Sequence, residues 1–398
     1  MNAETIRSWW WTKQGLDGSL VGASAADVLG RTGWIRSVGG AAPYLGLYAR
    51  AGLSRAAVDA AVANLEIHEL PSARGCTYVL PAADFALGLA AGEGFGDAAQ
   101  IATAKKYLGV TDEELSRLCA AVLGALVGGA LDPRELKGVL GETVRNLGAE
   151  GKKRGQTTTL PLALGWLQAR GQIRRVPLDG RLDRQRYAYT RWEPSPLAAS
   201  KRSEGEARTE LARRFFSWIG PATLAHFTAF SGFGVKDSKA AVEPLGLVPL
   251  AQGDARLLLP ADAASLTTHR PATSPRYSFL SNLDGLLLFR RELASLLDDR
   301  DASRKLWTEK GEVAGGALMD LSNQPIVDRG RIIGLWDFDG INDKLVWAAF
   351  SPADAALRDA AGAFENWVRT NLGDARTFSL DSPESRTSRL DAIRGMKA

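Results

Sequence analysis

The most constraining feature of this chain is a strongly basic segment between Lys152 and Arg191. The segment holds ten basic residues and only two acidic ones, Asp179 and Asp183, which gives it a formal charge of +8. The whole 398-residue chain carries only +4, so the remaining residues sum to about −4. Positive charge concentrated in this way favours a surface that meets a polyanion such as nucleic acid.

The local pattern of this segment predicts a helix followed by a two-stranded hairpin. Threonines at 157–159 can cap a helix, and leucines then follow at helical spacing over 160–167. Two short strands, 172–176 and 184–189, flank Asp179-Gly180, a dipeptide favoured in tight hairpin turns. A helix followed by a basic hairpin is typical of a winged helix, whose helix enters the major groove while the hairpin reaches phosphates. The alternative is a solvated hairpin that never meets nucleic acid.

The predicted contacts to duplex DNA come from three places: a basic run in a glycine-flanked loop, the basic hairpin, and an earlier hairpin. The predicted DNA-binding residues are Lys152, Lys153, Arg154, Arg174, Arg175, Arg181, Arg184, Arg186, Arg74 and Tyr78. For the loop run, an ordinary solvated loop is the alternative interpretation.

Composition excludes several classes of protein. Cys76 and Cys119 form no CxxC pair and the three histidines are scattered, so we expect no metal site and no cofactor. The longest uncharged apolar run, residues 118–131, is too short to span a bilayer. The first residues show no basic stretch followed by an apolar one, so no secretory signal is evident. We therefore expect a monomeric, cytoplasmic protein that binds double-stranded DNA and no membrane.

The order of predicted elements indicates an α+β chain in four parts. Helices followed by a hairpin recur three times, in residues 1–95, 96–195 and 196–270. Residues 271–398 change character, and short strands there suggest a small sheet or barrel against which a helix over 352–371 packs. Helices are predicted at residues 4–13, 25–31, 43–51, 54–64, 111–130, 132–147, 160–171, 204–219, 223–230, 236–245 and 352–371. Strands are predicted within 66–80 and at 248–250, 255–259, 278–280, 315–321, 324–327, 331–338 and 345–349.

Several conspicuous side chains have ordinary structural explanations. Trp9-Trp10-Trp11 point about 100° apart on a helix, so we expect one or two of them to be buried and one exposed. His226 lies among apolar residues and is expected to pack in the core. Asp284 is expected to cap backbone N–H groups, with a catalytic carboxylate as the alternative. Asp337 and Asp339 share one face of a strand, where either an exposed strand end or a cation site would explain them.

Eight short blocks follow one another in order along nearly the whole chain. They are Gln14-Gly15-Leu16, Val28-Leu29 leading to Gly33-Trp34, Tyr44 to Arg50, Gly52-Leu53-Ser54, Arg74 to Tyr78, Gly220 to Thr223, Ser281 to Leu288, and Arg329 to Trp336. Together they resemble the azinomycin-resistance and interstrand-crosslink repair DNA glycosylases of the AlkZ/YcaQ type. The resemblance implies three tandem winged-helix units arranged as a C around duplex DNA, plus a carboxy-terminal β-barrel.

The resemblance also implies monofunctional glycosylase chemistry on bulky or N7-alkylated purines, whose positive charge already weakens the glycosidic bond. Family members place a Gln-x-Gln or Gln-x-Asp motif just before the Tyr-Leu block, and the corresponding positions here are Ser37 and Gly39. Gly39 has no side chain, and Ser37 is a poor base without a partner. Glu66, Glu69 and Asp84 are the acidic residues that could approach it in space.

Three functions are consistent with these features. The first is recognition of damaged duplex DNA, with excision by a non-standard catalyst as an extension. The second is a non-catalytic winged-helix DNA binder such as a transcriptional regulator. The third is a protein-interaction scaffold whose winged helices no longer meet DNA. Abasic-site formation, a single preferred sequence, or an absence of salt-sensitive affinity would distinguish them.

Overall fold

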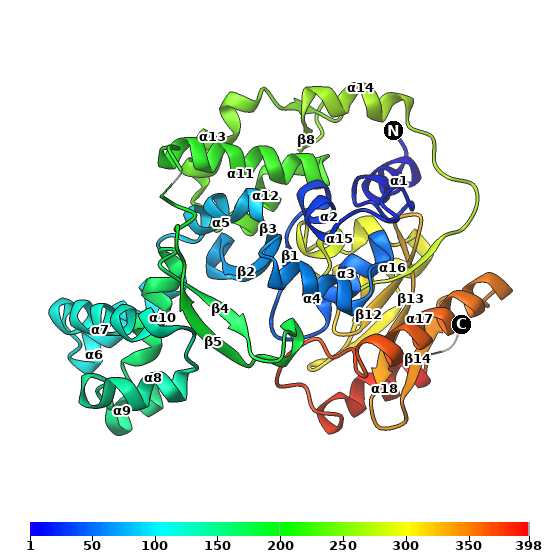
Figure 1. Ribbon diagram of the computed structural model, residues 1–398. Coiled ribbons are helices and arrows are strands. Elements are labelled where there is room, and N and C mark those ends of the chain that lie inside the picture. Colours follow the sequence, from blue (N-terminus) through cyan, green and yellow to red (C-terminus); the bar gives the residue numbers. More distant parts are fainter. Residues whose placement is uncertain (199, 397–398) are drawn as a thin grey trace.

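The computed structural model describes residues 1–198 and 200–396, in which helices surround small antiparallel sheets (Figure 1). Side chains of Asn2, Ser24 and Ser54 accept backbone N–H groups and so fix the starts of three early helices. The first elements are α1 (Ala3–Lys13), α2 (Ala25–Thr32), β1 (Ile35–Arg36), α3 (Ala42–Ala51), α4 (Arg55–Ala63), β2 (Ile67–Pro71), β3 (Thr77–Pro81) and α5 (Phe85–Gly92). The predicted helices and hairpin of this region are confirmed, whereas α5 was not predicted.

The first sheet has the strand order β1-β3-β2 and two different faces. Arg36 pairs with Tyr78 across the strands, and both side chains lie on the face that packs against the core around Trp34 and Phe230. Because successive side chains alternate, Ile35 and Val79 lie on the opposite face, against a second core. The two faces therefore present different side chains to different surroundings.

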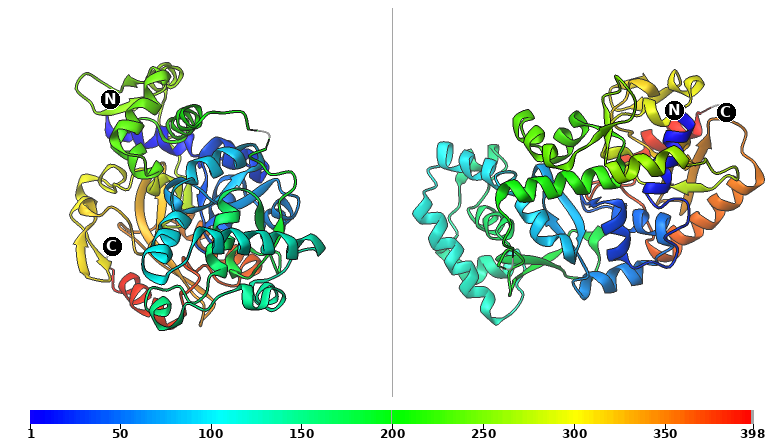
Figure 2. Two further views of the ribbon diagram at one scale, coloured as in Figure 1. Left: turned by 90° about the vertical axis from the view of Figure 1, so that its left-hand side faces the viewer. Right: turned by 90° about the horizontal axis from the view of Figure 1, so that it is seen from above.

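The next part of the chain forms a lobe at one end of the molecule, with a core of its own (Figures 1 and 2). Its elements are α6 (Asp97–Leu108), α7 (Asp112–Ala125), α8 (Pro133–Leu140), α9 (Gly148–Lys153), α10 (Leu160–Ala169), β4 (Ile173–Pro177) and β5 (Tyr187–Arg191). A capping box formed by Asp132 and Glu135 opens α8. The run at 152–154 belongs mostly to α9, so its prediction as a loop was wrong.

The basic hairpin exists, but its connection differs from the predicted tight turn. The last strand pair is Pro177 with Tyr187, so nine residues, 178–186, connect β4 to β5. Within this connection the backbone N–H of Leu182 donates to the Tyr44 hydroxyl at 2.9 Å, and Leu182 is buried. Anchoring on α3 therefore outweighs the local preference of the Asp-Gly dipeptide.

The third helical part packs against the start of the chain. Its elements are α11 (Glu204–Ile219), β6 (Ala222–Thr223), α12 (Leu224–Ser231), α13 (Val235–Val242), β7 (Val248–Pro249), β8 (Arg256–Leu258) and α14 (Pro260–Thr268). The indoles of Trp9 and Trp10 donate to the carbonyls of Gly220 and Pro221, at 2.9 and 3.2 Å. Trp11 is buried as well, so the expectation that one indole is exposed was wrong.

The carboxy-terminal part is an open sheet covered by helices. Its elements are β9 (Tyr277–Phe279), α15 (Gly285–Leu288), α16 (Asp299–Ala302), β10 (Lys305–Thr308), β11 (Gly311–Ala314), β12 (Gln324–Asp328), β13 (Arg331–Asp339), β14 (Lys344–Ala349), α17 (Ala355–Asn371) and α18 (Thr387–Arg394). The order β14-β13-β12-β9 leaves two edges, so the sheet is a half-barrel and not a complete barrel. Of the two predicted alternatives, a small sheet or a barrel, the open sheet is the one observed. The strand predicted at 315–321 is absent from the described structure, and the hairpin β10–β11 was missed.

The conspicuous carboxylates of this region are buried and form ion pairs. Asp284 caps α15 and pairs with the buried Arg50 at 2.7 Å, which confirms its structural interpretation. Asp337 and Asp339 are both buried, so the prediction of an exposed strand end was wrong. Their carboxylates pair with Arg389 and Arg394 of α18, at 3.5 and 2.6 Å respectively. Burial raises the pKa of Asp337 to about 6.

His226 and the apolar character of the helices were two further subjects of prediction. His226 is partly buried beside Phe227, and it also caps α12 reciprocally with Thr223. Burial, followed by nearby arginines, lowers the pKa of His226 to about 4. In the described part of the chain, no helix is both long enough and apolar enough to cross a membrane.

Candidate nucleic-acid interface

The Ser37 hydroxyl is held by a buried carboxylate. Ser37 follows β1, and its Oγ donates to Glu69 Oε1 on β2 at 2.5 Å; both residues are 2% exposed. Of the three acidic candidates, Glu69 is therefore the one that the fold brings to Ser37. Glu66 is exposed, and Asp84 instead accepts the Trp34 indole and pairs with Arg214.

The basic hairpin closes over the segment that contains Gly39. Gly39 has a φ of +75°, and a Cβ placed there would lie 2.1 Å from Cγ of Gln185. The Gln185 side chain, which comes from the connection between β4 and β5, thus occupies the space beside residue 39. Two segments far apart in the sequence form one site. Sequence reasoning missed Gln185, since nothing local marks it as a neighbour of Gly39.

Arg175 of β4 is half-buried and faces the Ser37 site. Its Nη1 lies 3.7 Å from Glu69 Oε2, and its guanidinium lies 5.0 Å from the centre of the Tyr187 ring. Burial, reinforced by the Glu69 carboxylate, raises the pKa of Tyr187 well above its ordinary value. The hydroxyl of Tyr187 therefore stays neutral, and Arg175 is the cation that balances Glu69.

Intramolecular carboxylates also engage several of the other predicted DNA-binding cations. Arg181 forms a bidentate pair with Asp183 and donates to the Leu372 carbonyl. Lys153 and Arg154 both pair with Glu150 of α9, at 3.7 and 2.7 Å. These cations stay near the surface, but their carboxylate partners weaken the attraction that each can exert on a DNA phosphate.

Four predicted cations of the basic segment remain without an ion pair in the part of the chain that the structure describes. Lys152, Arg184 and Arg186 are exposed, and Arg174 is partly buried. Arg184 and Arg186 flank Gln185, so they stand on both sides of the residue that covers Gly39. The strongest free positive charge of the hairpin therefore lies beside the Ser37 site.

Arg74 and Tyr78 lie on the other face of the first sheet. Arg74 is exposed in a left-handed conformation (φ +60°), and its Nη1 donates to the Ala229 carbonyl at 3.0 Å. Tyr78 is buried between Trp34 and Phe230, with the Arg36 guanidinium 5.5 Å from its ring centre. Of these two residues predicted to contact DNA, Arg74 is therefore accessible and Tyr78 is not.

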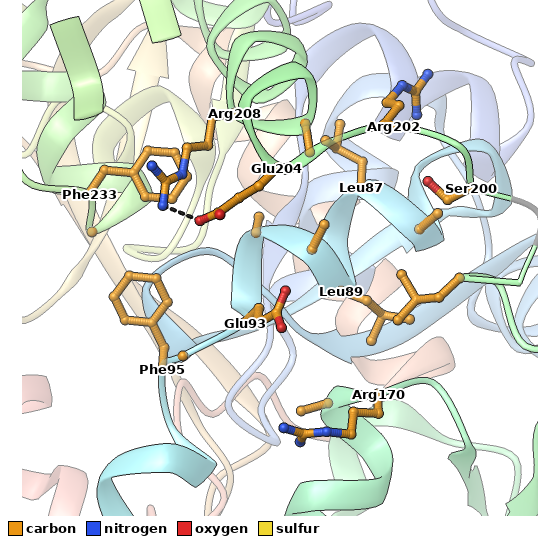
Figure 3. A pocket seen from close by; sticks show the side chains of 18 of the residues that line it. Leu87, Leu89, Glu93, Phe95, Arg170, Ser200, Arg202, Glu204, Arg208 and Phe233 are labelled. Atoms are coloured by element: carbon orange, nitrogen blue, oxygen red, sulfur yellow. Dashed lines mark hydrogen bonds and ion pairs between the residues drawn. The ribbon is translucent and has the colours of Figure 1, made fainter. Parts of the chain in front are cut away.

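A cavity of about 810 Å³ lies elsewhere, between α5, α10 and α11 (Figure 3). Leu87 and Leu89 supply part of its apolar wall. Ion pairs engage charged groups at its rim, Glu204 with Arg208 and Arg170 with Asp97. None of the predicted site residues lines this cavity.

The described residues offer no metal site. No group of three or more His, Cys, Asp or Glu side chains is placed to hold an ion in the portions 1–198 and 200–396. Cys76 is partly buried and Cys119 is buried, and both are free thiols. Desolvation raises the pKa of the Cys119 thiol to about 11.

Comparisons with known proteins agree with this architecture. The structure of the Streptomyces sahachiroi DNA glycosylase AlkZ is similar, with a TM-score of 0.69 and 21% sequence identity over 95% of this chain and 98% of that one. A family profile described as DNA glycosylase AlkZ-like matches residues 26–367. No curated protein sequence matches the chain. Since the profile covers most of its length, the chain belongs to the AlkZ-like DNA glycosylase family.

Proposed function

We propose that this protein recognises damaged duplex DNA, with bulky or N7-alkylated purines as the lesion class. The observation that carries the proposal is the contact between Gln185 and Gly39. It joins the basic hairpin to the segment where the resemblance places the catalytic motif, and it leaves Arg184 and Arg186 exposed on either side. Exposed guanidiniums beside a lesion-reading segment are suited to holding DNA phosphates.

In this proposal the three helix–hairpin parts act as winged helices arranged as a C around the duplex. For the second part, α10 would lie in the major groove and β4–β5 would contact the phosphate backbone. The partly exposed surface of β4–β5 and the free cations at its end support this assignment. The proposal includes a monomeric protein of the cytoplasm, with the half-barrel as a structural support.

We further propose that recognition occurs without excision through residue 37. The Ser37 hydroxyl is buried and donates a hydrogen bond to Glu69, so its oxygen is shielded from any water at the surface. Gly39 offers no side chain, and Gln185 fills the space beside it. A non-catalytic lesion binder is consistent with these contacts as they stand, because binding alone does not require Ser37 or Gln185 to move.

A second candidate is excision with Glu69 as the base. One observation favours it: a carboxylate lies directly behind the residue that occupies the motif position, at 2.5 Å from its hydroxyl. The lesion supplies much of the driving force, since an N7-alkylated purine leaves as a neutral base. Water would add to C1′ of the sugar as the glycosidic bond breaks, and its proton would pass to the Glu69 carboxylate.

The test uses matched duplexes that differ by a single N7-methylguanine. Preferential binding of the methylated duplex, with no alkali-sensitive strand breaks, supports recognition without excision. Breaks that appear with the wild type and vanish with Glu69→Gln would support the second candidate. Equal affinity for both duplexes would contradict lesion recognition, and an absence of salt-dependent affinity would contradict DNA binding altogether.

A further inference from the structure

We propose that a second cavity, of about 370 Å³, binds a nucleotide by stacking its base and pairing its phosphate with arginines. The cavity lies between the hairpin β10–β11, the end of α12 and the first sheet. Its size is within the range of sites that hold a nucleoside-sized ligand, which begins near ~300 Å³. No residue of the Ser37 site lines it.

The cavity lies on one face of the first sheet, and the Ser37 side chain lies on the opposite face. Arg36 and Tyr78 are a cross-strand pair, and both line the cavity. Ser37 comes next along the chain, so its side chain points to the other side, where it meets Glu69. A ligand in the cavity would therefore lie within one strand thickness of the proposed lesion-reading segment, without competing for its side chains.

Aromatic rings form a large part of the cavity wall. The lining rings come from β3, α12, β10 and the segment that follows α17: Tyr78, Phe230, Trp307 and Phe378. Phe378 is 43% exposed, which is unusual for a phenylalanine and leaves one ring accessible at the wall. Such rings stack on any base, because every base has a π-face.

Two arginines supply positive charge that no carboxylate of the described chain neutralises. The interactions that perturb the Arg36 guanidinium come from burial, Tyr78 and Arg74, with no acidic group among them. Its Nη1 is shielded from solvent and has no hydrogen-bond partner in the described structure. Arg74 makes one bond to a carbonyl and is otherwise exposed. An anionic group of the ligand would satisfy both cations at once.

Several other polar groups of the wall already have partners within the protein. Arg291 pairs with Asp320, and the Asn282 amide donates to the Leu321 carbonyl and accepts from Thr377. Few side-chain groups therefore remain to read the edge of a base. We infer a site with little preference among bases, in which stacking and the phosphate provide the affinity.

The nucleotide could be a free mononucleotide or one that has left the base stack of a duplex. The two sources share the same chemistry, a planar base joined to a phosphate. Binding of a nucleotide extruded from a duplex rests on the proposed function, whereas binding of a free mononucleotide does not. The same fluorescent base can report on both sources.

The first arm titrates the protein into 2-aminopurine riboside 5′-monophosphate, whose fluorescence falls when the base stacks on an aromatic ring. Arg36→Met is expected to weaken binding about tenfold, because it removes a charge-assisted hydrogen bond. Glu309→Gln removes the exposed acid at the rim and is expected to tighten binding about twofold. Arg358→Met, an equal change of charge at an exposed position of α17, should leave the dissociation constant unchanged.

Phe378→Ala provides a second variant should the Arg36 variant fold poorly, since Phe378 is partly exposed. It should raise the fluorescence of the bound probe as well as weaken binding about tenfold. Absence of quenching with the wild type, or equal binding by wild type, Arg36→Met and Phe378→Ala, would overturn the mononucleotide site.

The second arm places 2-aminopurine opposite an abasic site in a duplex. Quenching that Arg36→Met and Phe378→Ala relieve supports a base extruded from the duplex. If the duplex binds but its fluorescence is the same with wild type and variants, the cavity plays no part and the proposed function stands. If the mononucleotide binds and no duplex does, the proposed function fails and the site remains.

Discussion

Two hairpins of this protein have the same size but differ in how far they are buried. In β2–β3 and in β4–β5, two five-residue strands pair over five residue pairs. The first hairpin is almost wholly buried, whereas β4 is mostly half-exposed and carries Arg174 and Arg175. The shape of a hairpin therefore does not decide its role in this protein. What decides it is whether later helices cover the strands.

The two hairpins also meet through one ion pair. Glu69 of β2 lies beside Arg175 of β4, so the buried hairpin neutralises one cation of the exposed one. This leaves Arg184 and Arg186, in the connection, as the hairpin's freest charges. The charge of +8 counted from the sequence therefore overstates what a DNA phosphate would meet.

The largest expected effect tests the burial of the first hairpin. His68 of β2 contacts Phe85 and Trp192 edge-on, and burial lowers its pKa from 6.5 to about 3. The unfolded chain takes up this proton below pH 6.5, so the stabilising contribution is present in full above that pH. It is lost as the pH falls towards 3, and the loss amounts to about 4 kcal/mol at pH 3.

His68→Phe removes this dependence while it fills the same space. We expect the variant to lose about 4 kcal/mol less of its unfolding free energy than wild type between pH 7 and pH 3. Urea unfolding at several pH values measures the difference. Parallel curves for the two proteins would show that His68 takes up its proton at the same pH in the folded and the unfolded state.

The next effect tests the link between the hairpins. Glu69→Ala leaves Arg175 and the Ser37 hydroxyl without their carboxylate, and we expect a loss of about 3 kcal/mol of unfolding free energy. Glu69→Gln keeps an acceptor for Ser37 and should lose roughly half as much. Urea unfolding at pH 7 compares the three proteins. Wild-type stability in both variants would mean that the hairpins are independent.

Much of the fold could be predicted because local signals and tertiary packing agree. Helix α11 begins after Ser203, which forms a capping box with Glu206, and ends before Gly220 at the predicted residue. Helix α18 was missed, because its polar sequence gives no amphipathic signal. Its stability comes from Leu390 and Ile393, buried against β13 and β14. Such long-range packing leaves no local trace in the sequence.

The candidate site could be predicted only in part. The sequence indicated the basic residues and offered Glu69 as one of three acidic partners for Ser37. It could not indicate Gln185, because its contact with Gly39 depends on how the connection 178–186 folds back onto α3. Nor could it separate free arginines from paired ones, since the partners lie in other elements.

The third effect tests the free charges of the exposed hairpin. Arg184→Ala combined with Arg186→Ala should lower the slope of log K against log salt by about 2, since each phosphate contact contributes about 0.9. Fluorescence anisotropy with a labelled duplex, measured from low to moderate salt, gives the slope. Arg358→Ala on α17 is the matched control and should keep the wild-type slope. An unchanged slope in the double variant would remove this hairpin from the DNA interface.

The smallest effect concerns a cation of the same hairpin that already has partners. Arg181 pairs with Asp183 and donates to the Leu372 carbonyl, so it fastens the connection to the carboxy-terminal part. We expect Arg181→Gln to cost about 1 kcal/mol of unfolding free energy and to leave the salt slope of DNA binding unchanged. A slope that falls by about 1 would show that DNA takes Arg181 away from Asp183. In that case ion pairing within the free protein would be a poor guide to which arginines contact phosphates, and the distinction drawn between Arg181 and Arg184 would have to be given up.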